Sequence, residues 1–537
     1  MSRRWSKNGK SNSHEQPDSG QAALLASVLI PAVLLAGLFV FNTSQSSATK
    51  IRTQNAADAA AFSAMQMEAR ELNFISYTNR AMVANQVAIG QTISLVSWVH
   101  YVKNLGINIK TIGQISSLIP GVGSIIVTIT NAIAQTTQVL DQSIETTSRV
   151  VLPALDITDA ALSGAQEVYH FSNGVFDPGG GSNKPGGAMT AVAEQVVKFN
   201  DPQAQLNGIV LASNLAAYFQ YRSDLIQRWG SDKDQAQARM AYMINASRDG
   251  FTQQRNDLPL PFSPKIIRQG DFGVVGWEFR RAGASSIIHS ADGKYAWSGM
   301  DTLSFHSWRR KGIIFGGKKW TETTLGYGAS QTGGGNNYTY APNYTEIQAT
   351  PQEAYSPIGK AVSLPAYENS WRRNPNASGK AANQYSEEQN PFGAAAKPVG
   401  GDATRFSSGG ISRYWDFNRE SQKLLNANGD PADIMPYYVA VVEHQRQRLR
   451  DSSGALDINK IPDQEKMNIV LPQNNSADYI RSIAKAQVYF RRPASLWARK
   501  DHYYERGNLF SPYWEARLVD LNSTDRARYA TILCLQK

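Results

Sequence analysis

This chain of 537 residues has a single cysteine, Cys534. One cysteine excludes an intramolecular disulfide and every metal site built from CxxC pairs. The seven histidines show neither an HExxH motif nor another close spacing of metal ligands. The sequence therefore predicts no metal and no other cofactor.

Charged residues are missing from residues 19–49, and residues 22–41 are apolar except for Ser27. Twenty helical residues span about 30 Å, the thickness of the hydrocarbon core of a bilayer. The preceding tail carries four basic side chains, whereas the first stretch beyond the run carries two. Because basic residues favour the cytoplasmic side, we expect a cytoplasmic tail at residues 1–19 and a single transmembrane anchor at residues 20–41.

A cleaved secretory signal peptide is the alternative for this run. The apolar region of such a peptide has about 7–15 residues and precedes a cleavage site of small residues. The run here is longer, although the SSA triplet at residues 46–48 would suit cleavage. The length of the run favours a retained anchor.

Proline is missing between Pro31 and Pro120, and apolar residues recur at spacings of three and four through residues 62–87. This pattern predicts one long helix that continues out of the membrane. Further helices are expected at residues 124–170, at residues 188–229 with an interruption near Asp201-Pro202, and at residues 231–249. We therefore expect residues 42–257 to form a helical stalk or bundle.

A second charge-free run covers residues 111–140. It contains many Thr, Ser, Asn and Gln residues and is interrupted by PGVG at residues 120–123. A membrane span should be predominantly apolar, so this run predicts two amphipathic helices joined by a turn.

The character of the sequence changes at LPLPFSP, residues 258–264. Short runs rich in Val, Ile, Tyr, Trp and Phe then alternate with Gly and Asn turns, as is typical of antiparallel strands. MPYYVAVVEHQRQRLR at residues 435–450 predicts a helix, and AKAQVYFRRP and SPYWEARLVDL predict strands that close the sheet. We expect residues 258–537 to be a distal extracytoplasmic domain, and the fold class to be α+β.

A glycine (Gly20), an apolar helix with a central proline (Pro31) and the segment QNAADAAA at residues 54–61 follow the basic tail in this order. The arrangement resembles the N-terminal module of TadE/TadG-like Flp (tight adherence) pilus-assembly proteins. Pilins processed by a prepilin peptidase carry a glutamate five residues after the cleavage-site glycine, and Leu25 stands at that position here. The resemblance is therefore closer to the TadG branch.

Some TadG-like proteins also carry a von Willebrand A domain with an Asp-x-Ser-x-Ser metal motif. The nearest string in this sequence, residues 451–455, lacks the second serine. We expect no such metal site.

The resemblance implies a non-catalytic structural or assembly component of a Tad/Flp-like pilus or related secretion apparatus. It implies one pass through the bacterial inner membrane, with the bulk of the chain in the periplasm and in contact with pilus or secretion-system proteins. The net charge of +10 adds an anionic envelope polymer as a candidate partner. Nucleic acid is not expected, because no recognisable nucleic-acid motif accompanies the charge.

An enzyme that acts on cell-envelope glycans is the alternative function. The carboxylates Asp292, Asp301 and Glu278 would have to form an acid pair in a cleft. His289 and His306 lie in neighbouring predicted strands and could meet, but no third ligand accompanies them. Structural roles are expected for all five residues.

A nucleotide site has one partial motif. GIIFGGKK at residues 312–319 fits G-x-x-x-x-G-K but places Lys319 where the magnesium-binding Ser or Thr belongs. The following residues have the pattern of a strand, so no helix N-terminus is offered to a phosphate. The motif predicts a strand-turn-strand.

A glycan-binding adhesin is a third possibility, because flat aromatic rings supply contact area at low entropic cost. Such rings are equally common in the core of a sheet. The aromatic residues considered for this surface are Trp297, Trp308, Trp320, Tyr338, Tyr340 and Tyr344.

Seven alanines lie within residues 54–70. Alanine has the highest helix propensity, but Ala56, Ala60 and Ala64 also share one helical face, where small side chains let another helix approach closely. The expected partner is the helix at residues 124–170 or a helix of another protein. The residues expected to carry the family motif and this packing are Gly20, Pro31, Gln54, Asn55, Ala56, Asp58, Ala60 and Ala64.

Overall fold

The structure is a computed structural model of the chain. It describes residues 19–116, 123–174, 187–229, 235–253, 255, 269–289, 295–310, 317–332, 403–407, 409–417, 435–445, 479–492 and 507–534. The cytoplasmic tail expected at residues 1–19 lies outside this part of the chain apart from its last residue. The segments Asp451 to Ala455 and Tyr338 to Tyr344 also lie outside it.

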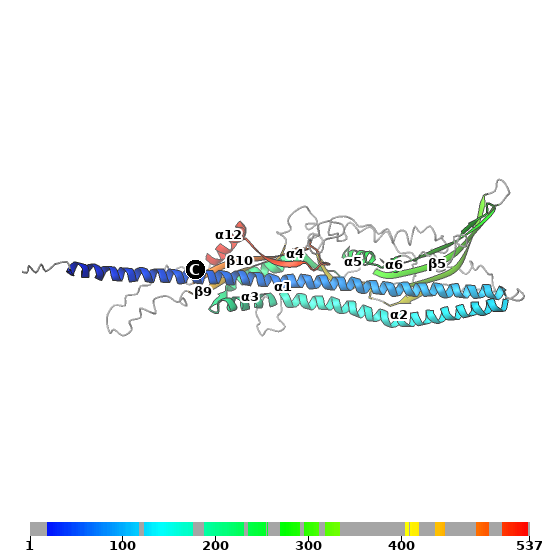
Figure 1. The fold of residues 1–537 in the computed structure, drawn as a ribbon, viewed down its shortest axis with the longest axis horizontal. Helices are drawn as coiled ribbons and strands as arrows, with labels where there is room; N and C mark the ends of the chain where they lie inside the picture. Colours follow the sequence, from blue (N-terminus) through cyan, green and yellow to red (C-terminus); the bar gives the residue numbers. More distant parts are fainter. Residues whose placement is uncertain are drawn as a thin grey trace, which may run out of the picture.

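One helix, α1 (Ser19–Ser116), forms the axis of the molecule. Its 98 residues correspond to a length of roughly 150 Å at 1.5 Å per residue. Pro31 is the one proline inside it, and the alanine-rich sequence beyond residue 54 favours a helix strongly. The prediction of one helix that continues from the apolar segment is confirmed (Figure 1).

Two further helices return along α1. Helix α2 (Gly123–Gly174) lies beside α1 and runs antiparallel to it, and α3 (Gly187–Asn200) continues in the same direction (Figure 1). Gly187 has a φ of 56°, and a Cβ there would lie 2.7 Å from the carbonyl oxygen of Asn173, so the start of α3 requires glycine. The run at residues 111–140 does contain the end of one helix and the start of another. The turn expected at residues 120–123 lies outside the described residues except for Gly123, which begins α2.

The helical stretch expected at residues 188–229, with an interruption near Asp201-Pro202, is found as two helices, but residues 204–206 and 226–229 are strands. Beyond Asn200 the chain forms β1 (Ala204–Leu206), α4 (Gly208–Leu225) and β2 (Ile226–Trp229). Helices α5 (Gln235–Ala246) and α6 (Gly250–Gln253) follow. Asp201-Pro202 ends α3 because proline disfavours a helical conformation in the residue before it.

A four-stranded antiparallel sheet lies next to the alanine-rich part of α1. Its strand order is β1-β9-β10-β11, with β9 at Tyr437–Gln445, β10 at Tyr479–Phe490 and β11 at Trp514–Val519. The helix predicted at residues 435–450 is therefore wrong, because residues 437–445 are strand β9. This strand lies between β1 and β10 and is buried on both faces, so its sequence is a continuous apolar run without alternation.

A five-stranded sheet covers the far part of α1. Its order is β3-β4-β5-β6-β7, and all neighbours are antiparallel except β6 and β7. The strands are β3 (Gln269–Asp271), β4 (Val275–His289), β5 (Tyr295–Arg310), β6 (Lys318–Thr332) and β7 (Ala403–Phe406). Several short predicted strands thus merge into long ones. Strand β8 (Tyr414–Phe417) pairs with β2, and α12 (Ser523–Cys534) ends the described chain.

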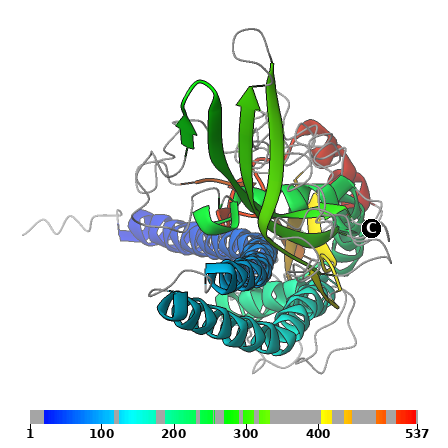
Figure 2. The same ribbon diagram turned by 90° about the vertical axis from the view of Figure 1, so that its right-hand side faces the viewer.

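The α+β fold class is confirmed, but the sheets are not distal to the helices. Viewed from the end, the five-stranded sheet lies on one side of α1 and α2 on the other (Figure 2). One core joins residues 56–75 of α1 to α3 and the four-stranded sheet, and a second joins residues 82–96 to α2, α5 and the five-stranded sheet. Packing therefore crosses the boundary proposed at residues 257 and 258, which remains a prediction.

Candidate functional site at the base of the long helix

The first part of α1 exposes a continuous set of large apolar side chains. These side chains run from Leu24 to Phe41, and Val28 is 67% exposed. Of the described helices, one is long and apolar enough to cross a membrane; it covers Ala23–Lys110, and its most apolar window has no burial. This part of α1 projects beyond the rest of the molecule (Figure 1). So large an apolar surface is typical of contact with lipid or protein.

Burial along α1 begins directly after this segment. Asn42 is 6% exposed, and Thr49 and Thr53 are also buried. Gly20 and Pro31 both lie in the projecting part of the helix, and Pro31 is exposed. The segment expected at residues 20–41 thus coincides with the uncovered part of α1.

Polar side chains then attach α1 to strand β10. The Gln54 amide nitrogen donates hydrogen bonds to the Asp58 carboxylate at 2.9 Å and to the Ile483 carbonyl oxygen at 3.1 Å. Lys50 donates to the carbonyl oxygen of Arg481, two residues before Ile483 in the same strand. Asn55 is exposed, so the motif residues Gln54 and Asp58 contribute to this attachment and Asn55 does not.

The alanines of the motif are fully buried. Ala56, Ala60 and Ala64 each have no exposed surface, and Ala57 and Ala61 are buried to the same degree. They share one core with Met189, Ala193 and Val197 of α3 and with side chains of β9, β10 and β11. Small side chains on two neighbouring faces let a helix and a sheet approach α1 together.

The helix expected to cover these alanines, residues 124–170, does not reach them. Helix α2 ends level with Glu71, where the Asn173 amide donates to the Glu71 carboxylate at 2.6 Å and His170 Nδ1 lies 2.8 Å from the other carboxylate oxygen. Helix α3 and the four-stranded sheet take the place of α2 beyond this point. The expected partner is therefore corrected to α3 and the sheet.

Two asparagines that sequence reasoning missed continue the attachment. Asn73 forms a pair of hydrogen bonds with the backbone of Trp514, donating at 2.9 Å and accepting at 3.0 Å. Asn79 donates to the carbonyl oxygens of Trp415 at 2.9 Å and Leu509 at 2.8 Å. The available signal was the presence of amide side chains within an otherwise apolar helical face.

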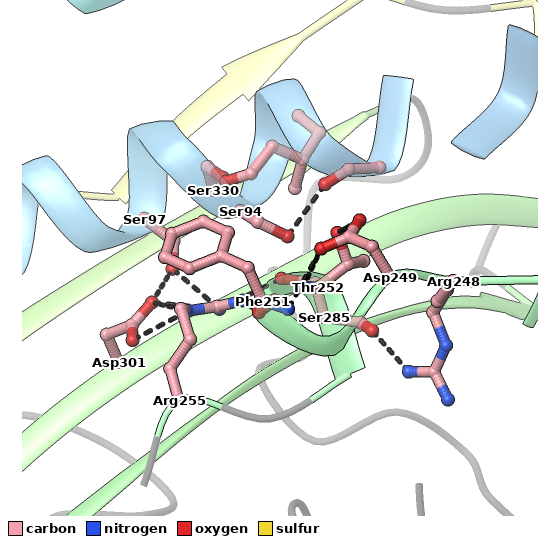
Figure 3. Close-up of polar contacts among 12 residues, drawn as sticks. Ser94, Ser97, Arg248, Asp249, Phe251, Thr252, Arg255, Ser285, Asp301 and Ser330 are labelled. Carbon is pink, nitrogen blue, oxygen red and sulfur yellow. Dashed lines mark hydrogen bonds and ion pairs between the residues drawn. The ribbon is translucent and has the colours of Figure 1, made fainter. Parts of the chain in front are cut away.

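A buried ion pair attaches the far sheet to α1. Arg255 Nη2 lies 2.9 Å from Asp301 Oδ2, and both side chains are almost completely buried (Figure 3). Ser97 of α1 donates to the same carboxylate, and the Arg255 guanidinium also donates to Ser285 Oγ at 3.0 Å. Asp301 is therefore a structural carboxylate, as expected, and is unavailable as one member of an acid pair.

His289 and His306, which could have met in space, lie far apart along the strands. In the β4–β5 register His289 is opposite Tyr295, whereas His306 is opposite Glu278. Residues 278 and 289 lie toward opposite ends of β4, so the two histidines belong to different parts of the sheet. Asp292 lies outside the described residues.

The aromatic residues considered for a binding surface are partly explained by the core. Trp297 and Trp308 are buried, so neither offers a ring to a glycan. Trp320 lies in β6, and the three tyrosines lie outside the described residues. Lys318 and Lys319 open strand β6, which agrees with the strand expected after the partial phosphate motif.

One group of possible metal ligands occurs among the described residues. Ligand atoms of His100, Asp141 and Glu145 lie within 4.8 Å of one another. His100 Nδ1 lies 2.5 Å from Asp141 Oδ1, and Lys103 Nζ lies 2.8 Å from Asp141 Oδ2. Burial raises the pKa of Asp141, but the hydrogen bonds from His100 and Lys103 outweigh burial and leave the pKa below its usual value. Because His100 and Lys103 of α1 engage both carboxylate oxygens of Asp141 on α2, these three residues form a polar network that joins the two helices.

Comparison with known proteins gives one match. Residues 20–67 match the family model described as "Putative Flp pilus-assembly TadE/G-like". No curated protein and no solved structure matches the chain. The match covers less than a tenth of the 537 residues, and it contains both the projecting apolar segment and the buried alanines. The segment that leads α1 from its uncovered part into the folded chain is therefore similar to the TadE/G-like segment of Flp pilus-assembly proteins.

Proposed function

We propose that this chain is a non-catalytic structural component of a Tad/Flp-like pilus or related secretion apparatus, anchored in the bacterial inner membrane by α1. One observation carries the proposal. The TadE/G-like residues 20–67 form an uninterrupted helix whose first part exposes apolar side chains and whose second part is enclosed by α3 and the four-stranded sheet. Such a segment holds a folded body at a fixed position on a membrane.

The proposed topology is a single pass with the N-terminus in the cytoplasm and the folded body in the periplasm. The four basic residues of the tail support this orientation. Retention of the anchor is supported by Asn42 and Lys50, which contribute to the folded part on either side of the SSA triplet. Cleavage after residue 48 would remove Asn42 and leave Lys50 in a frayed helix end.

The proposed mechanism is positional. Helix α1 attaches to both sheets through side chains such as Gln54, Asn73 and Ser97, so the membrane segment and the folded body move as one unit. Pilus or secretion-system proteins are the proposed partners, as the TadE/G-like segment supports. An anionic envelope polymer is a further proposed partner, supported by the net charge of +10.

The experiment uses cells whose pilus depends on this chain. Residues 20–41 are replaced by a cleavable signal peptide, so that the folded body is exported without its anchor. We expect pili to be lost while the exported body remains folded, and we expect crosslinking to recover pilus proteins with the full chain only. A matched control replaces residues 20–41 with an unrelated membrane helix of equal length, which should restore anchoring.

Two results would contradict the proposal. The first is normal pilus assembly by the exported, unanchored body. The second is crosslinking of the full chain, in piliated cells, that recovers no pilus component.

A further inference from the structure

The end of α3 carries an aromatic side chain that the fold leaves uncovered. Phe199 is 90% exposed, although Val197, two residues earlier, is fully buried in the core. Lys198, between them, is also exposed. Phe199 is the most exposed large apolar side chain among the described residues.

Phe199 lies near the level of Lys50, the first charged residue of α1 after the apolar segment. Asp201 follows it by two residues, and the Asp201 carboxylate lies 2.8 Å from Nδ1 of His444 on β9. His444 pairs with Ile480 of β10, and the carbonyl oxygen of the next residue, Arg481, accepts the hydrogen bond from Lys50. In Figure 1, α3 and β9 accordingly lie beside the first covered part of α1.

The same level of the molecule carries exposed cations. Ile51 is 62% exposed, and Lys50 and Arg52 on either side of it are exposed. Three acidic side chains on the neighbouring elements are bound by basic side chains within the fold, whereas Asp520, directly after β11, is exposed. These pairs are Asp201 with His444, Glu443 with Arg481, and Asp525 with Lys485.

We propose that Phe199 enters the headgroup region of the bilayer that holds α1, and that Lys198 and Arg52 bind anionic phospholipid headgroups there. The inference rests on the proposed membrane anchoring. Aromatic side chains and cations gather at the interface between a bilayer and water, where rings meet the acyl boundary and cations meet phosphates. The apolar segment of α1 and Phe199 of α3 then seat the body on the membrane at two separate elements.

Spin labels in the full chain test the inference. In a Cys534→Ser background, single cysteines replace Phe199, Val33 of the apolar segment, or Phe272, which is 63% exposed in the five-stranded sheet. Each labelled chain is placed in nanodiscs of phosphatidylcholine alone or rich in phosphatidylglycerol. Accessibility to oxygen and to a water-soluble nickel complex is then measured for each label.

We expect the label at 199 to be more accessible to oxygen and less accessible to nickel in the anionic discs than the label at 272. Adding Arg52→Gln and Lys198→Gln should reverse most of this shift, since both side chains are exposed and leave the core unchanged. If the label at 33 is in lipid but the labels at 199 and 272 are equally accessible to nickel, the inference is wrong and the proposed membrane anchor is retained. If the label at 33 is accessible to nickel, the proposed membrane anchoring by α1 is wrong.

Discussion

The side chain of Asn73 and the backbone of Trp514 form a reciprocal pair of hydrogen bonds between α1 and β11. The residues are separated by 441 positions in the chain. An asparagine amide can replace the backbone of a neighbouring strand, because it offers one donor and one acceptor in the same plane. The edge of the four-stranded sheet is therefore held by the helix that also carries the apolar segment.

Replacing Asn73 with alanine should reduce the free energy of unfolding by about 1–3 kcal/mol, the usual cost of leaving buried polar partners unpaired. Urea unfolding of the purified chain in detergent measures the effect. Asn55→Ala is the matched control, because Asn55 is an exposed asparagine of the same helix. Equal midpoints for both variants would show that the pair contributes nothing to stability.

Ala60→Leu should destabilise the fold by about 1–3 kcal/mol, because extra methylenes must enter a closed space between α1, α3 and the sheet. Ala84→Leu is the control, since Ala84 is exposed on the same helix and the two substitutions have the same helix propensity. Ala69 cannot serve as a control, because it is buried in the same core. Ala60→Leu should lower both the thermal unfolding temperature and the number of pili, and Ala84→Leu should change neither. If Ala60→Leu changes neither, helix propensity alone explains the alanines.

Asp301→Asn should cost about 3–5 kcal/mol, because it leaves the buried Arg255 guanidinium without its counter-ion. Hydrogen exchange should increase first in β4 and β5, which this carboxylate attaches to α1. The comparison variant is Glu145→Gln, which removes the partner of the exposed Arg149 and should change stability by less than about 1 kcal/mol. Exchange that increases uniformly along the chain would argue against a local attachment.

Asp159 should give the stability a measurable pH dependence. Burial raises the pKa of Asp159 to about 6, although the amides of Gln86 and Asn85 donate to its carboxylate. Because the folded pKa exceeds the unfolded value of 3.8, the folded state binds the proton more tightly. The contribution to stability is therefore complete below about pH 4 and is lost as the pH rises through about 6.

The check is the difference in unfolding free energy between the wild-type chain and Asp159→Asn, measured from pH 4 to pH 8. Wild type should lose stability relative to the variant between about pH 4 and pH 6 and remain level above about pH 7. A difference that is constant over the whole range would mean that the carboxyl group keeps its ordinary pKa in the fold.

The long helix and its uncovered segment could be predicted from the sequence because both depend on local properties. The missing charges before Lys50 and the missing prolines after Pro31 are sufficient to predict them. Strand β9 could not be predicted in the same way. Its run YYVAVVEH lacks alternation because a central strand in this sheet is covered on both faces, and a short apolar run of this kind fits a helix equally well.

The partners of the alanines depend on where α2 ends. The spacing of Ala56, Ala60 and Ala64 correctly indicated a close approach, but no local signal indicated that α2 would stop level with Glu71 and leave the approach to α3 and a sheet. Arg255 is a similar case. Its partners Ser97 and Asp301 are separated from it by 158 and 46 positions, so only the folded chain brings them together.

Because α1 is continuous, a tilt of its membrane segment moves the far end of the molecule as well. Between Asn42 and Tyr101, where the five-stranded sheet still packs on the helix, about 60 residues correspond to roughly 90 Å of unbroken helix. A tilt of only about 10° in the membrane would then move the far sheet sideways by roughly 15 Å. Small rearrangements among neighbouring membrane helices would thus produce large displacements far from the bilayer, without any change in the fold of the body.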